Sequence, residues 1–587
     1  MARWPLLVSV ALTLTCAGAC GPHTERHQKQ EEGEDPPAPR VVTPSGAIRG
    51  SWMKTRRERA FQAYRGIRYA EPPVGELRFQ PPKLIRHYDE EVDATSDGPI
   101  CPQPAEPEMD VREDCLMLNV YTPQTNNSQL LPVIVYVHGG GFIGRSGSSL
   151  FLGPHYLLER DLVLVTFNYR VAALGFLVTG DGLVPGNNGL KDQVAALLWV
   201  QRNIAAFGGD PARVTLAGNA VGAISVGLHM ISPMSQGLFH GAICLSGSPL
   251  PIRPVVERDR ARAVQQSVRQ AELVGCPTNT TRIMLDCLRT IDYRVLADSL
   301  LDFCPMTALD PLKIWSPVVE EFGEERFVPE EPQQAMLEGR ARVPCIVGRT
   351  RDEFFWIGFS LVLTLETKNG TVRNWTNNEW DNHSNLGSYL PDLEPWWPVH
   401  ELRRAYLGRD SVGQSPRVLA RLGRLYSDTI LGYPVHRLAE LLSRYSPRPV
   451  YYFEFSYVGN FSHYNDPVTN KPIGAVHKDD TVYLFTSRHH PRVIPLDSPD
   501  NKVVERMTAI FYNFARYGDP NGQDGAALGL HWPALRPARG DYLRVGAALS
   551  VHQRLFHDLF SAWEELYPLP TPTETPTQSY YDGSNDV

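Results

Sequence analysis

The sequence has neither a long apolar run beyond its N-terminus nor an excess of basic residues. No later stretch reaches 18 uninterrupted apolar residues, so we expect no transmembrane segment. The net charge of −8 excludes the basic stripe that nucleic acid requires, and the chain has no polybasic patch for a membrane surface. His463 and the pair His489-His490 lack the spacing of metal ligands, which indicates surface histidines. We therefore expect no metal and no cofactor.

The N-terminus instead has the pattern of a secretory signal peptide. Arg3 precedes an apolar run from Leu6 to Leu14, and Ala17-Gly18-Ala19 forms a cleavage site of small residues. This pattern predicts a signal peptide over residues 1–19 and a secreted, extracellular protein.

The rest of the chain divides by composition. Residues 20–38 are polar and charged and predict a disordered leader, whereas the Pro/Thr-rich residues 568–587 predict a disordered tail. Residues 39–567 contain no long linker and no internal repeat, and we expect them to form one domain.

Sequons and cysteines agree with export. N-x-S/T sequons, which mark glycosylation sites in exported chains, occur at Asn126, Asn279, Asn369, Asn374, Asn382 and Asn460. Two of the nine cysteines lie in the signal region, and the remaining ones are Cys101, Cys115, Cys244, Cys276, Cys287, Cys304 and Cys345. Their odd number requires at least one free thiol or an intermolecular bond. Short separations favour the pairs Cys101–Cys115 and Cys276–Cys287, but spacing alone leaves the connectivity open.

The central segment alternates strand and helix patterns. Continuous apolar runs at residues 133–137 and 162–165 are typical of strands covered on both faces, and residues 214–217 read as another. A helical pattern over residues 194–204 stops at Gly208-Gly209-Asp210-Pro211. This order predicts an α/β fold with a large, mostly parallel sheet flanked by helices.

One pentapeptide lies where chemistry is expected. Gly218-Asn219-Ala220-Val221-Gly222 connects the strand at 214–217 to a helical pattern of Ile224, Leu228 and Ile231. Strand, Gly-x-Ser-x-Gly and helix form the nucleophile elbow of α/β-hydrolases, in which a serine stands on a strained turn. Here the middle residue is alanine, which has no nucleophilic atom.

Longer stretches carry a resemblance to a known family. They are YRGIRYAEPPVGELRFQPP from Tyr64, EDCLMLNVYTP from Glu113, HGGGF from His138, NYRVAALGFL from Asn168, GNNGLKDQ from Gly186, FGGDPARVTLAG from Phe207, GAVHKDDTVYLF from Gly474 and NFARYGDPN from Asn513. The chain thereby resembles the cholinesterase/carboxylesterase (type B) family from about Val41 to Leu566, and the segment from Gly474 looks like that of arthropod-type carboxylesterases. The resemblance implies the α/β-hydrolase fold.

The resemblance also implies roles for individual residues. Glu353 and His477 match the acid and the histidine of the family's triad, and Ala220 matches the position of its serine. The oxyanion hole maps to the backbone N–H groups of Gly140, Gly141 and Val221. The two short cysteine pairs match disulfides of the family. No aromatic residue lies between Cys101 and Cys115, so no quaternary-ammonium site is expected.

Departures from the family pattern cluster around Ala220. Asn219 and Val221 stand where the family has Glu and Ala, and Phe354 stands where it has glycine beside the acid. A serine hydrolase without its nucleophile loses about 10⁶-fold in turnover. Ser225 and Ser246 are close in sequence but are not at the elbow, so we expect no replacement by either.

These departures predict a protein that is not a working enzyme and acts in extracellular binding or adhesion, with an extracellular protein or a small hydrophobic ligand as partner. Two alternatives remain open. One is a serine carboxylesterase that hydrolyses carboxylic esters, if Ala220 replaces a native serine; the other is a carrier of small hydrophobic ligands. The final helix, with Leu555, Leu559, Trp563 and Leu566, matches a place where some relatives form homodimers, although such helices more often pack on their own domain.

Overall fold

The computed structural model describes residues 36–104, 109–123, 129–250, 256–303, 314–356, 397–408, 410, 416–466, 469–488, 493–523 and 528–571. One compact unit begins at Ala38. The predicted signal peptide, nearly all of the predicted leader and the tail beyond residue 571 lie outside the described residues. Those boundaries therefore stay predictions. Among the described residues, no helix is long and apolar enough to cross a membrane.

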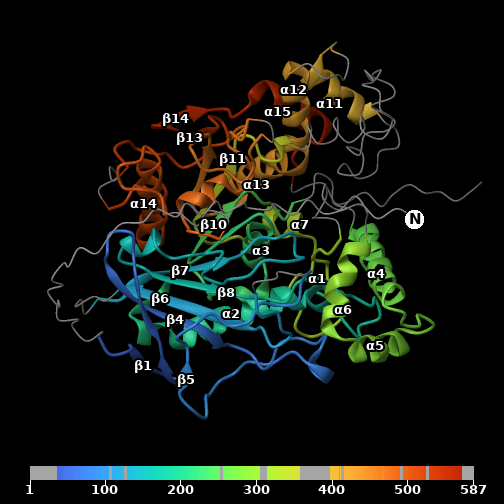
Figure 1. The fold of residues 1–587 in the computed structure, drawn as a ribbon. Coiled ribbons are helices and arrows are strands. Elements are labelled where there is room, and N and C mark those ends of the chain that lie inside the picture. The colour runs from blue at the N-terminus through green and yellow to red at the C-terminus, as the bar shows by residue number, and fades with distance from the viewer. Residues whose placement is uncertain are drawn as a thin grey trace, which may run out of the picture. The chain divides into compact units, whose positions relative to one another are not determined.

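The unit is built on a large sheet (Figure 1). Its eleven strands lie in the order β14-β13-β12-β11-β10-β9-β7-β8-β6-β4-β3. The pairs from β8 through β13 are parallel, and both ends of the sheet are antiparallel. The strands are β3 (Ser51–Lys54), β4 (Ala60–Arg68), β6 (Met117–Pro123), β7 (Leu131–Val137), β8 (Val163–Phe167), β9 (Gly209–Asn219), β10 (Gly241–Leu245), β11 (Cys345–Thr350), β12 (Val450–Phe455), β13 (Asp541–Val545) and β14 (Leu549–Gln553). This architecture confirms the predicted mostly parallel α/β fold.

A small second sheet and the helices complete the unit. The small sheet contains β1 (Arg40–Thr43), β2 (Gly46–Arg49) and β5 (Val92–Asp93). The α-helices are α1 (Ala172–Phe176), α2 (Asn188–Asn203), α3 (Val221–His229), α4 (Val256–Leu273), α5 (Thr281–Thr290), α6 (Tyr293–Asp298), α7 (Pro332–Leu337), α11 (Trp397–Leu407), α12 (Pro416–Ser427), α13 (Tyr433–Tyr445), α14 (Asn501–Tyr517) and α15 (His557–Leu566). Short 3₁₀ turns include η2 (Leu157–Glu159) and η9 (Asp479–Tyr483), and α12 continues into α13 through a π-helical turn, η8 (Asp428–Gly432).

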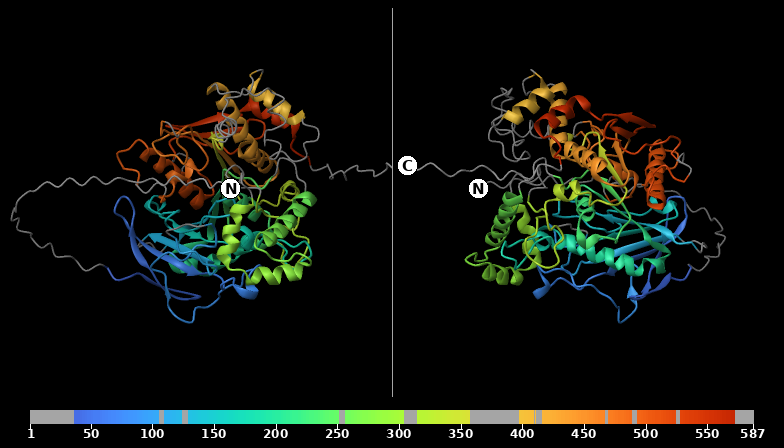
Figure 2. Two further views of the ribbon diagram at one scale, coloured as in Figure 1. Left: turned by 45° about the vertical axis from the view of Figure 1, so that its right-hand side comes forward. Right: turned by 180° about the vertical axis from the view of Figure 1, so that it is seen from behind.

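Successive side chains of the central strands point to opposite faces of the sheet, so the core lies in two layers. Val133, Val135 and Val137 of β7 pack with α2, α3 and α13, while Ile134 and Tyr136 face the other way and pack with α14 and η2. All of these side chains are buried, because helices or loops cover both faces of the sheet. A third cluster joins α11, α12 and α15, which lie together at the top of Figure 1 and again in both views of Figure 2. The final helix thus packs on its own domain through Phe560 and Trp563.

Element ends differ from the sequence prediction in a few places. We predicted that Gly208 to Pro211 form a break, but β9 begins at Gly209, because the chain there pairs with Leu131 at the start of β7. Ile231 was assigned to the helix after the pentapeptide, and α3 ends before it, at His229. One error concerns the start of a strand and the other the end of a helix, and such boundaries are where local pattern is weakest.

Two disulfide bonds join described residues, Cys101–Cys115 and Cys276–Cys287, and they are the pairs that the resemblance implied. Cys244 and Cys345 are free thiols buried in the adjacent strands β10 and β11. Cys304 lies outside the described residues.

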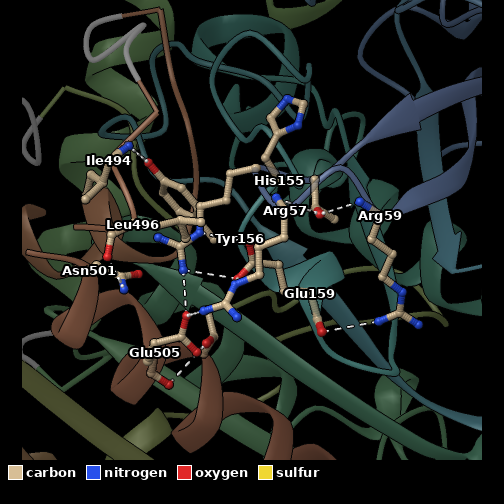
Figure 3. A network of polar contacts seen from close by, with 12 residues as sticks. Arg57, Arg59, His155, Tyr156, Glu159, Ile494, Leu496, Asn501 and Glu505 are labelled. Carbon is tan, nitrogen blue, oxygen red and sulfur yellow. Dashed lines mark hydrogen bonds and ion pairs between the residues drawn. The ribbon is translucent and has the colours of Figure 1, made fainter. Parts of the chain in front are cut away.

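A network of arginine and glutamate side chains ties the N-terminal hairpin to α14 (Figure 3). Arg56, in the turn between β3 and β4, donates to Glu159 of η2 (Nε to Oε1, 2.8 Å) and to Glu505 of α14 (Nη2 to Oε1, 2.8 Å). Arg57 and Arg160 also pair with Glu505. The Arg56 side chain is 2% exposed and that of Glu159 9% exposed. These charges therefore depend on one another rather than on water.

We expect Glu159→Gln to lower the free energy of unfolding by about 3 kcal/mol, because it leaves the buried Arg56 guanidinium without one of its two carboxylates. Urea unfolding followed by circular dichroism measures the change. The control is Lys54→Gln, which removes an exposed ion pair with Glu58 and should cost about 0–1 kcal/mol. Equal effects of the two substitutions would contradict the prediction.

Candidate active site

The turn between β9 and α3 carries Ala220. Its backbone has φ 53° and ψ −123°, a conformation that costs a residue other than glycine roughly 1–3 kcal/mol. Its N–H donates to the Leu245 carbonyl (2.8 Å), which holds the turn against β10. The Ala220 methyl group lines a cavity of about 480 Å³ at the carboxyl ends of the parallel strands. The pentapeptide thus has the expected strand–turn–helix context.

Glycines on both sides of Ala220 explain why the turn is so tight. A Cβ atom at Gly222 would lie 2.2 Å from the Val137 carbonyl oxygen of β7, and one at Gly218 would lie 2.6 Å from the Gly222 carbonyl carbon. No side chain fits either distance. Both glycines are therefore required by the close packing of α3 on the sheet.

His477 and Glu353 form a buried pair beside this turn. The imidazole Nδ1 is 2.7 Å from Glu353 Oε2, and the other carboxylate oxygen accepts a hydrogen bond from Thr350 N–H (2.8 Å). Glu353 follows β11 and is fully buried, and the His477 N–H donates to the Glu353 carbonyl (2.9 Å). The backbone thus fixes both side chains, and His477 lines the same cavity as Ala220.

The protonation states of the pair follow from burial and from their contact. Burial alone would raise the pKa of Glu353, but the hydrogen bond from His477 and the charge of Arg349 hold it below its usual range. Burial lowers the pKa of His477, and Glu353 offsets part of that effect. At neutral pH the imidazole is therefore neutral, and its second ring nitrogen is able to accept a proton.

A glycine-rich loop lines the same cavity. Gly140 and Gly141 follow β7, have φ values of 116° and 67°, and line the cavity. A Cβ atom at Gly140 would lie 2.2 Å from the Gly144 carbonyl oxygen, so the loop bends only with glycine there. Val221 is fully buried and contributes the first N–H group of α3, which has no partner within the helix. The three residues expected at the oxyanion hole thus lie around Ala220.

Phe354 packs on the imidazole instead of displacing it. Its ring stacks on His477 with centroids 4.7 Å apart and an angle of 22°, and it contacts Trp356, which in turn stacks on Tyr464 (5.3 Å). The His477–Glu353 hydrogen bond is intact under this stack. Phe354 also belongs to the cluster of α11, α12 and α15, so it joins that cluster to the site.

The other serines and histidines named from the sequence differ in whether they line the cavity. Ser225 donates to the Val221 carbonyl inside α3, and Ser246 is buried after β10; neither lines the cavity. His463 is exposed, as predicted, but it lines the cavity, which its spacing did not reveal. His489-His490 lie outside the described residues. Among the described residues, no group of three His, Cys, Asp or Glu side chains could hold a metal ion.

Two of the six sequons, at Asn279 and Asn460, lie among the residues that the structure describes. Asn279 is exposed, and Asn460 is exposed but donates through Nδ2 to Asp500 Oδ2 (2.8 Å). Asn126, Asn369, Asn374 and Asn382 lie outside the described residues.

Two cations in the cavity wall, Lys478 and Arg145, were not predicted from the sequence. Lys478 follows His477 directly, and its position next to the histidine was the only signal in the sequence. Arg145 lies in the loop after β7, where nothing in the pattern singled it out.

The sequence matches the carboxylesterase family over residues 37–563, and the chain therefore belongs to that family. It is 34% identical over 548 residues to the juvenile hormone esterase of Tribolium castaneum, covering 88% of this chain and 89% of that protein. It is 36% identical over 502 residues to esterase FE4 of Myzus persicae, covering 83% and 86%. The structure is similar to that of juvenile hormone esterase from Manduca sexta with OTFP covalently attached, with a TM-score of 0.75, 26% identity and coverage of 90% of this chain and 99% of that one.

The prediction that the chain is not an enzyme is wrong. It depended on the missing hydroxyl at Ala220, whereas relatives that match nearly the whole chain are named as esterases and point to an enzyme. The prediction gave too much weight to one side chain, because the buried imidazole–carboxylate pair and the glycine loop are both in place around the cavity. The comparisons give no support to adhesion and favour the alternative of an ester hydrolase.

We expect the His477 imidazole to titrate below its ordinary pKa of 6.5, and Glu353→Gln to lower that pKa further, because it removes the negative charge that favours the imidazolium. NMR of protein labelled with ¹³C-histidine measures both values. Histidines far from Glu353 provide the control and should not shift on substitution. A rise in the His477 pKa in the variant would contradict the assignment.

Proposed function

We propose that this chain is a carboxylic ester hydrolase in which His477 activates a water molecule that attacks the ester directly. The observation that carries the proposal is the 2.7 Å bond between His477 Nδ1 and Glu353 Oε2, buried beside Ala220 and the glycine loop. An imidazole oriented by a carboxylate is a general base in ester hydrolysis, whatever supplies the attacking oxygen. Family membership supports the choice of esters as substrates.

The proposed reaction needs no acyl-enzyme. The second ring nitrogen of His477 takes a proton from water, and the water oxygen bonds to the ester carbonyl carbon. The carbonyl electrons move to its oxygen, and the N–H groups of Gly140, Gly141 and Val221 donate to that oxyanion. When the intermediate collapses, the bond to the alkoxy group breaks, and His477 returns the proton to the departing oxygen. The products are an acid and an alcohol.

Ala220 sets the expected rate. In a serine hydrolase the loss of the nucleophile costs about 10⁶-fold in turnover and leaves roughly 10³–10⁴-fold above the reaction in water, from the oxyanion hole and binding. We therefore expect slow turnover in this chain. The role of Ala220 as the position of a family serine is part of this proposal.

The first test compares the chain with its Ala220→Ser variant on p-nitrophenyl butyrate. The original chain should turn over slowly with no burst, and an organophosphate should not label it covalently, because Ala220 has no oxygen to acylate. Ala220→Ser should raise turnover, although Asn219 and Val221 differ from the family pattern beside it. His477→Ala, made in the original chain, should lower the rate of ester hydrolysis to that in buffer alone. The matched control, Ala205→Ser on the exposed surface, should change nothing.

Turnover in the original chain that survives His477→Ala would contradict the water mechanism. A stoichiometric adduct on any serine would instead indicate a serine route.

We also propose that the chain is exported, glycosylated and acts extracellularly. The supporting observations are the N-terminal pattern and the sequons. Mass spectrometry of the protein secreted from an animal cell line should find cleavage after Ala19 and a glycan on the exposed Asn279. Asn279→Gln should remove the mass of one glycan. The control is Asn470→Gln, because Asn470 is exposed but is not in a sequon, and this substitution should leave the glycan mass unchanged. Retention of residues 1–19 would contradict export.

A further inference from the structure

We propose that the side-chain amide of Asn219 orients the attacking water in the hydrolysis of the ester. The inference rests on the proposed function and adds a second side chain that contacts the reacting atoms. It starts from a hydrogen-bond donor in the cavity wall that the proposed reaction does not yet use. Asn219 is the last residue of β9 and directly precedes Ala220, and both residues line the cavity.

The acceptor end of this amide is held by the sheet. The Tyr136 hydroxyl donates to Asn219 Oδ1 (3.3 Å). Tyr136 is fully buried in β7, where it is paired with Ala217 of β9, and its ring meets Phe485 edge-on with centroids 4.6 Å apart. Because the amide group is planar, a fixed Oδ1 also fixes the direction of Nδ2.

The donor end of the amide faces the cavity. Asn219 is only 6% exposed, yet among the described residues nothing accepts a hydrogen bond from its Nδ2. Nδ2 is not one of the polar atoms that are sealed in the interior without a partner, so it reaches the open space of the cavity. A donor in such a place bonds to water or to substrate.

The amide nitrogen lies close to the Ala220 methyl group. A Cβ atom placed on Gly139 would be 3.2 Å from Asn219 Nδ2 and 3.2 Å from Ala220 Cβ, so both atoms border on the same point. In the proposed reaction, water attacks from beside this methyl group, where a serine would carry its oxygen. That water has the amide donor on one side and the cavity that His477 lines on the other.

The imidazole and the amide contact different parts of the water molecule. His477 accepts one proton from water, and one lone pair of the water oxygen bonds to the ester carbon. The second lone pair accepts a hydrogen bond from Asn219 Nδ2, which fixes the orientation of the oxygen during the attack. A side-chain amide orients the attacking water in other hydrolytic enzymes as well. The glutamate that the resemblance places at this position would, as a carboxylate, offer the water only acceptors.

Substitution of Asn219 in the original chain tests this role. Asn219→Ala should lower kcat for p-nitrophenyl butyrate about tenfold, the loss expected of one neutral hydrogen bond, and leave KM within about twofold. Asn219→Asp has nearly the same shape and still accepts from Tyr136, but it should lower kcat to a similar extent because it has no donor. The control Gln334→Ala removes an exposed amide on α7 and should change neither constant. Circular dichroism melting curves check that each variant is folded.

The Ala220→Ser variant separates the orientation of water from a general effect on the site. With p-nitrophenyl butyrate, its burst reports attack by the serine oxygen, and its steady state reports attack by water on the acyl-enzyme. Asn219→Ala, added to this variant, should leave the burst rate within about twofold and slow the steady state about tenfold. A merely structural role of Asn219 would slow both phases together, because both use the same oxyanion hole.

The inference is overturned if Asn219→Ala leaves kcat unchanged while turnover still depends on His477, or if burst and steady state slow equally. Full turnover in Asn219→Asp would show that the shape of the side chain matters and the donor does not, and would also overturn it. An original chain without any turnover that depends on His477 would instead refute the proposed function. The steady state of the Ala220→Ser variant then still decides the role of Asn219, so the two failures are distinguishable.

Discussion

The close approach of β7, β9 and α3 is the constraint on which the rest of the site depends. At Gly222 the helix lies so near the Val137 carbonyl that no Cβ atom fits, and the chain passes from strand to helix within one strained residue. That geometry brings the start of α3 to the carboxyl ends of the strands, where the glycine loop after β7 also ends. The constraint is one of packing and does not involve the side chain at position 220. The turn therefore forms with alanine as well as it would with serine.

The buried pair of His477 and Glu353 depends on different contacts. Its parts come from the loops that follow β12 and β11, and a backbone hydrogen bond between the two residues sets their relative position. Phe354 packs on the imidazole and leaves the pair intact. The proposed base is thus prepared independently of the residue at the elbow. This independence is why one altered side chain was a poor basis for excluding enzymatic activity.

Sequence patterns predicted the strands of the central sheet and the turn at the elbow. The runs at residues 133–137 and 214–217 are strands because apolar side chains there meet helices on both faces of the sheet, and the glycines at 218 and 222 marked the elbow. The resemblance placed Glu353 and His477 together, although they are far apart in the chain. The place of Lys478 and Arg145 in the cavity wall could not be predicted in the same way. It depends on how the loops after β7 and β12 fold over the ends of the strands, and only the folded chain shows that.

Phe354 connects two parts of the molecule that could open separately. Its ring rests on His477, yet it belongs to the cluster of α11, α12 and α15, which is distinct from the two cores that hold the sheet. Small clusters of this kind can unfold locally at a lower free energy than the whole domain. If α11, α12 and α15 loosen first on heating, the imidazole loses the ring that covers one of its faces while the sheet is still intact. The operating temperature of the site is then limited by its least stable helices and not by the melting of the fold.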